Sequence, residues 1–73
     1  MRLKIVAKGD EVLKARLEIG LSQTEMAMVL GIGQRYLAGI ESGSHPVSIR
    51  LGSRMRKLFG KRFYEIFDFE GRR

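Results

Sequence analysis

The sequence predicts an all-α domain of five short helices, preceded by a short extended arm. Apolar residues recur at helical spacing through most of the 73 residues. Glycines follow these periodic segments at the places where helices commonly end, and the alternation typical of a strand is confined to residues 3–6. A chain of this length forms one domain with a thin core, because it buries only about 60% of its unfolded surface.

The chain is expected to begin with an N-terminal arm over residues 1–9. The alternating segment 3–6 favours either a short strand or an extended arm. Asp10 is a suitable N-cap for a first helix over residues 11–19, which Gly20 would end.

Two closely spaced helices are expected next. Ser22 and Glu25 have the spacing of a capping box, in which each residue satisfies a free backbone donor of the other. They would start a second helix over residues 23–30. Gly31 breaks this helix, and a third helix is expected over residues 34–41.

Two further helices and a tail complete the chain. Ser48 is the expected cap of a fourth helix that runs through Phe59, and a fifth helix is expected over residues 62–67. Gly52 falls where an apolar core residue is expected, and the sequence offers no physical reason for it. Residues 68–73 are expected to form a flexible basic tail.

The spacing of small and apolar residues in the second and third helices is that of a helix-turn-helix. Ala27 is small where two helices would cross closely, and Gly31 is free to adopt the positive φ of a sharp turn. The remaining positions point into the angle between the helices and hold it, namely Met26, Leu30, Ile32, Leu37 and Ile40.

At these residues the sequence resembles the Cro/phage-repressor (XRE) family of helix-turn-helix proteins. The resemblance is carried by Leu21-Ser22-Gln23-Thr24-Glu25-Met26-Ala27, Leu30-Gly31-Ile32, Ile40-Glu41-Ser42-Gly43, Pro46, Phe59-Gly60 and Glu65-Ile66-Phe67. It covers residues 10–67. It implies a lambda-repressor-like five-helix bundle that binds DNA as a dimer and regulates transcription. Tyr64 and Phe69 are candidate dimer contacts, since an exposed apolar patch commonly marks an interface.

In such a module the third helix is the recognition helix. Gln34 and Arg35 at its start are expected to read base edges, because glutamine can pair bidentately with adenine and arginine with guanine. The resemblance adds Ala38, which would contact a thymine methyl group, and Gly39. Gly39 departs from the family, in which a long side chain often stands at this position.

Phosphate contacts are expected from two places. The resemblance and the free backbone N–H groups at the start of the second helix indicate Ser22 and Gln23. The loop after the third helix lacks the lysine or arginine common in the family, so Arg50 and Arg54 in the fourth helix are expected to supply positive charge. A solvated, solubilising face is the alternative interpretation of these arginines.

One pair of charged residues is expected to be structural. The family pairs an arginine of the first helix with the glutamate that ends the third, and Arg16 and Glu41 stand at the matching positions.

The composition favours a polyanionic partner and argues against catalysis. The net charge is +6, with 14 Lys and Arg against 8 Asp and Glu. The chain has no cysteine and one histidine, His45, which we expect to be an exposed loop residue. We therefore expect no metal, cofactor, small-molecule substrate or enzymatic activity. Without an apolar stretch long enough for a membrane, the protein is expected in the cytoplasm, associated with the nucleoid.

Two functions are compatible with the sequence. The first is a repressor-like, sequence-specific regulator that binds double-stranded DNA as a homodimer. The alternative is an interaction module of the antitoxin or anti-repressor type, whose partner would be a protein such as a toxin. Gly39 and the loop without lysine or arginine favour this alternative somewhat. The arm would pair with another chain or reach along DNA.

Overall fold

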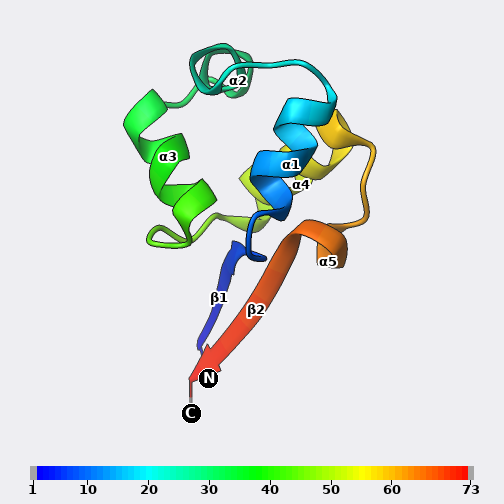
Figure 1. Ribbon diagram of the computed structural model, residues 1–73. Coiled ribbons are helices and arrows are strands. Elements are labelled where there is room, and N and C mark those ends of the chain that lie inside the picture. Colours follow the sequence, from blue (N-terminus) through cyan, green and yellow to red (C-terminus); the bar gives the residue numbers. More distant parts are fainter. Residues whose placement is uncertain (1, 73) are drawn as a thin grey trace.

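A computed structural model describes residues 2–72 of the chain. Helices and strands follow one another in the order β1 (Arg2–Ala7), α1 (Glu11–Glu18), α2 (Gln23–Leu30), α3 (Gln34–Ser42), α4 (Ile49–Phe59), α5 (Phe63–Ile66) and β2 (Phe67–Arg72). The expected helices are therefore present, with ends that differ by at most a residue or two. Figure 1 shows the helices above and a two-stranded ribbon that projects from them.

Local signals account for the start and end of α2. The Ser22 hydroxyl accepts a hydrogen bond from the Glu25 backbone N–H at 3.0 Å, and the Ser22 N–H donates to Glu25 Oε1 at 2.8 Å. This is the predicted capping box. Gly31 ends α2 with φ of 70°, which a residue with a side chain rarely adopts. Asp10 precedes α1 as predicted, but its side chain accepts no capping hydrogen bond.

The fold is mostly helical, and the prediction of an all-α domain with a flexible tail is corrected by the ribbon. β1 and β2 pair antiparallel, with Leu3 opposite Gly71, Ile5 opposite Phe69 and Ala7 opposite Phe67. The expected tail over residues 68–73 thus belongs to a strand as far as residue 72, and residue 73 lies outside the described part. The expected N-terminal arm contains β1, which is the partner strand of β2.

The alternation of side chains along the two strands explains why β1 and β2 pair. Opposite residues point to the same face, so Ile5, Ala7, Phe67 and Phe69 share one apolar face of the ribbon. Ile5 also accepts a hydrogen bond at its backbone oxygen from the Val47 N–H, at 2.8 Å, which ties the ribbon to the loop before α4. The alternation of residues 3–6 indicates a strand or an arm, whereas β2 lies largely in the segment expected to be a tail.

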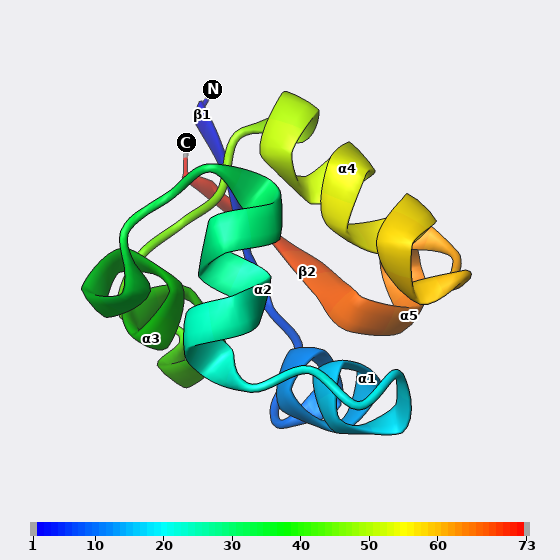
Figure 2. The same ribbon diagram turned by 90° about the horizontal axis from the view of Figure 1, so that it is seen from above.

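The core lies between the helices and the base of the ribbon. Seven side chains are almost fully buried, and they come from every helix and from β2: Val12, Met26, Leu37, Ile40, Met55, Ile66 and Phe67. Ala27 is also buried. In Figure 2, α2 lies between α3 and α4, and it contacts both. The core is therefore built around the pair of helices predicted to form the helix-turn-helix.

The structure explains Gly52. The rings of Phe63 and Phe67 pack against α4 at this residue, and a Cβ atom added there would lie 3.0 Å from Cε2 of Phe63 and 3.3 Å from Cε2 of Phe67. Gly52 is itself buried. The position is apolar and interior, as expected, but two aromatic rings from α5 and β2 fill its space.

Candidate nucleic-acid interface

α3 has one buried face and one exposed face. Leu37 and Ile40 are completely buried beneath it. Arg35, Gly39 and Ser42 are spaced by four and three residues, which places them on one line along the opposite side of the helix. We call this line the outward face of α3. Its polar and small residues leave it open to a partner.

The four predicted base-reading residues are arranged around this face. The Gln34 and Arg35 side chains are exposed, whereas Ala38 and Gly39 are half-buried. Arg35 and Gly39 belong to the outward face itself, and Gln34 and Ala38 lie on the side of it that turns towards α2.

A buried ion pair joins α1 to the end of α3. Nε of Arg16 donates to Oε2 of Glu41 at 2.8 Å, and its Nη2 donates to Oε1 at 3.3 Å. The Arg16 and Glu41 side chains are only 9% and 8% exposed. Nη1 of Arg16 also donates to the backbone oxygen of Leu21 at 3.0 Å. Such two-pronged pairs fix the relative position of the groups that they join.

The pair continues as a chain of hydrogen bonds to the start of α3. Nε2 of Gln23 donates to Oε1 of Glu41 at 3.1 Å, and Nε2 of Gln34 donates to Oε1 of Gln23 at 3.3 Å. The buried pair therefore holds Gln23, and Gln23 holds the side chain of Gln34. The structure thus brings the predicted phosphate-binding and base-reading glutamines into direct contact.

At the start of α2 the structure distinguishes Ser22 from Gln23. The backbone N–H and hydroxyl group of Ser22 are both used in the capping box with Glu25. Hydrogen bonding to the Glu25 carboxylate, first by the Ser22 backbone N–H and then by the Ser22 side chain, lowers the pKa of Glu25 below its usual value. Within residues 2–72, the backbone N–H groups of Gln23 and Thr24 have no protein acceptor. A phosphate at this end of α2 would therefore meet the N–H groups of Gln23 and Thr24 before that of Ser22.

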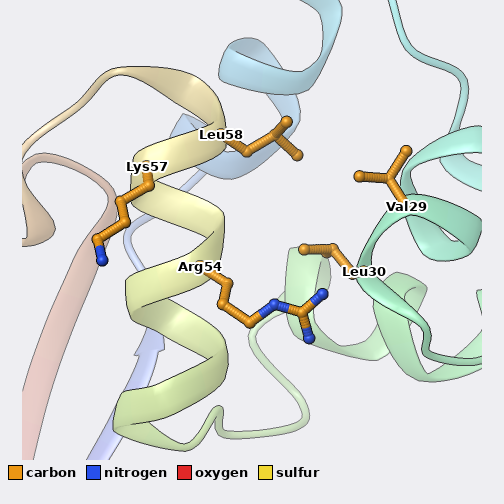
Figure 3. A pocket seen from close by; sticks show the side chains of 5 residues that line it. All are labelled: Val29, Leu30, Arg54, Lys57 and Leu58. Carbon is orange, nitrogen blue, oxygen red and sulfur yellow. The ribbon is translucent and has the colours of Figure 1, made fainter.

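Arg50 and Arg54 lie on α4, away from the chain of hydrogen bonds just described. Both side chains are exposed. The guanidinium of Arg54 extends towards the end of α2, where Val29 and Leu30 face it across a shallow groove of about 380 Å³ (Figure 3). Lys57 and Leu58 complete the groove. Arg50 lies one turn earlier on α4 and does not line this groove.

Sequence reasoning missed the contact of the loop after α3 with α3 itself. His45, expected as an exposed loop residue, is exposed but lies against Gly39. Its ring also approaches that of Tyr36, with centroids 5.8 Å apart. The available signal was Gly39, a glycine inside a helix, where the residue lowers stability.

No group of three or more His, Cys, Asp or Glu side chains in residues 2–72 is arranged to bind a metal ion. Within the same residues, none of the helices has the length and apolar character needed to cross a membrane.

The fold and the outward face of α3 define a helix-turn-helix domain. The sequence model of a helix-turn-helix family matches residues 12–66, and the chain belongs to this family. The predicted XRE-type resemblance is thereby confirmed. The family consists of DNA-binding transcriptional regulators.

Relatives support the same family. The chain is 32% identical over 50 residues to an uncharacterised HTH-type transcriptional regulator of Methanocaldococcus jannaschii, covering 68% of this chain and 76% of that protein. It is 27% identical over 55 residues to an uncharacterised HTH-type transcriptional regulator of Archaeoglobus fulgidus, covering 75% of this chain and 79% of the relative.

Two solved structures share the fold. The restriction-modification controller protein C.AhdI of Aeromonas hydrophila superposes with a TM-score of 0.68 at 26% identity, over 78% of this chain and 86% of that one. The transcriptional regulator VanUg superposes with a TM-score of 0.66 at 11% identity, over 99% of this chain and 92% of that one. The second match extends over the ribbon as well as the helices.

Proposed function

We propose that this protein is a sequence-specific, repressor-like transcriptional regulator that inserts α3 into the major groove of double-stranded DNA. The observation that carries the proposal is the outward face of α3, where Arg35 and Ser42 are exposed while the buried ion pair and the core fix the helix from behind. A recognition helix must be held rigidly, because its side chains have to meet base edges in a defined register.

The proposed base contacts follow from the placement of the side chains. Arg35 is exposed on the outward face and can form two hydrogen bonds with O6 and N7 of guanine. Gln34 can pair with adenine, either while it stays hydrogen-bonded to Gln23 or by exchanging that hydrogen bond for one to the base. Ala38 would contact a thymine methyl group. Gly39 has no side chain and would offer only its backbone to the groove.

Phosphates are proposed to bind on either side of this helix. Gln23 and the free N–H groups at the start of α2 would hold one phosphate, with Ser22 keeping the helix end in shape. Arg50 would contact another from the start of α4, and Arg54 is the second candidate there. The net charge of +6 would favour association with DNA at low salt.

We also propose that the protein acts as a homodimer. Tyr64 and Phe69, the candidate dimer contacts, are 57% and 55% exposed. Two copies related by a twofold axis would place their recognition helices on half-sites about 34–36 Å apart. A regulator of this kind would work where the chromosome lies, in the cytoplasm at the nucleoid.

Selection of bound sequences from a pool of random duplexes tests the proposal, followed by titrations with the selected duplex at several salt concentrations. Arg35→Ala should lose about 1–3 kcal/mol of binding free energy and relax the preference at one base position. Arg50→Ala should weaken binding to all sequences and reduce the salt dependence by about one phosphate contact. Lys14→Ala is the matched control, because it removes one exposed positive charge from α1.

Two outcomes would count against the proposal. If Arg35→Ala binds the selected and unrelated duplexes as the parent does, α3 does not read DNA. If the parent selects no sequence and instead copurifies with a stoichiometric protein, the alternative of an antitoxin-like or anti-repressor-like module replaces the proposal.

A further inference from the structure

The imidazole of His45 occupies the place of a missing side chain in the middle of the recognition helix. A Cβ atom added to Gly39 would overlap Cδ2 of the His45 ring and lie 2.8 Å from its Nε2 and 2.9 Å from its Cγ. Gly39 belongs to the outward face of α3, four residues after Arg35. The ring of a loop residue therefore lies against the outward face of α3 at Gly39.

The loop that carries this ring is anchored on α3. The backbone oxygen of Gly39 accepts hydrogen bonds from the N–H groups of Ser44 at 2.9 Å and His45 at 3.1 Å. The Ser42 hydroxyl donates to the same oxygen at 3.0 Å. These contacts fix the backbone of His45 relative to the helix, so that the ring is not carried by a free loop.

Tyr36 supports the ring from one side. The Tyr36 and His45 ring centroids are 5.8 Å apart with planes inclined by 40°, and the Tyr36 hydroxyl donates to the backbone oxygen of Pro46 at 3.4 Å. The ring is thus held between Tyr36 and Gly39 while the residue stays exposed. A side chain already held in place loses less conformational freedom when it binds.

We propose that His45 is a base-contacting residue of this protein, which presents its ring from the loop where the helix itself has no side chain. This inference rests on the proposed function. An imidazole offers a nitrogen donor, and in its neutral form also an acceptor, which suits the donors and acceptors along the major-groove edges of the bases. The ring lies beside Gly39 of the outward face, on the side of α3 opposite the buried Leu37 and Ile40.

The proposal also explains why residue 39 is glycine. Glycine inside a helix lowers helix stability relative to alanine. Any side chain here would occupy the space of the ring and force His45 away from α3. Gly39 lowers the stability of the helix, and its missing side chain leaves the space that the His45 ring fills.

Three variants test the proposal, each measured by titration of the selected duplex and of a scrambled duplex. His45→Ala removes the ring, and His45→Phe keeps a ring without nitrogen atoms. Both should lose about tenfold in affinity for the selected duplex, as expected for loss of one base contact, with no change on the scrambled duplex. Gly39→Ala should give a similar loss by displacing the ring.

The double variant Gly39→Ala/His45→Ala separates loss of the contact from damage to the fold. It should bind no more weakly than either single variant, and its melting temperature should equal or exceed that of His45→Ala, since the added methyl group then has room. Unchanged affinity in His45→Ala would overturn the proposal. So would an equal loss on both duplexes, which would indicate a phosphate contact or a disturbed loop.

Failure of this inference can be told apart from failure of the proposed function. If the parent selects a sequence and Arg35→Ala weakens it, but the His45 variants bind as the parent does, only the role of His45 is wrong. If the parent selects no sequence, the proposed function fails and His45 has no base to contact.

Discussion

Replacing Arg16 should destabilise the protein far more than replacing any exposed charge of α1. Arg16→Ala removes three hydrogen bonds and leaves the Glu41 carboxylate, 8% exposed, with Gln23 as its remaining side-chain partner. Breaking a buried pair in this way costs about 3–5 kcal/mol. A domain of this size has a total stability of about 4–11 kcal/mol, so the loss is a large part of it.

Thermal and urea unfolding followed by circular dichroism measure the effect. Since 1 kcal/mol shifts the melting temperature of a 60–100-residue domain by about 4–8 °C, Arg16→Ala should melt at least about 12 °C lower. Lys14→Ala is the control: its side chain is 65% exposed and 3.7 Å from Glu11, and it should shift the midpoint by less than about 4 °C. Equal midpoints for the two variants would refute the reasoning.

A third variant separates a lost ion pair from a lost side chain. Arg16→Met combined with Glu41→Leu removes both charges and keeps most of the volume. It should recover a substantial part of the stability, because an apolar pair carries no uncompensated charge. If Arg16→Ala proves unfolded, this double variant still tests the explanation.

Two further predictions concern packing and pH. Gly52→Val should cost about 1–3 kcal/mol in urea unfolding, because the new side chain has to displace the rings of Phe63 and Phe67, and a neutral or stabilising result would contradict the packing described at this site. The pKa of Glu25 is lowered in the folded chain, so its contribution to stability is present at neutral pH and is lost as the pH falls through that lowered pKa. Melts from pH 7 to pH 3 should therefore show a weaker acid dependence in Glu25→Ala, and identical slopes would count against the capping box as a source of stability.

The parts of the fold that the sequence predicted depend on local signals. The capping box of Ser22 and Glu25, the turn at Gly31 and the buried stripe that includes Leu37 can each be recognised within a few residues. This is why the helices could be predicted from the chain. The predicted DNA contacts stay predictions until DNA binding is measured.

The parts that could not be predicted depend on residues far apart in the chain. β1 and β2 pair across nearly the whole sequence. The alternation of residues 3–6 favours a strand or an arm, but nothing near it in the chain indicates that residues 67–72 are its partner. Gly52 and Gly39 are explained only by rings that approach from α5 and β2 in one case and from the loop in the other. A missing side chain gives no indication in the sequence of which neighbour takes its space.

The pairing of β1 with β2 has a consequence for synthesis. β1 leaves the ribosome before any helix, and its partner is the last of the described elements to emerge. Until then Ile5 and Ala7 lack the strand that lies beside them, and Phe67 cannot close the interior. We expect this fold to acquire its final cooperative stability only after β2 has emerged from the ribosome, in a late step that joins β1 to β2.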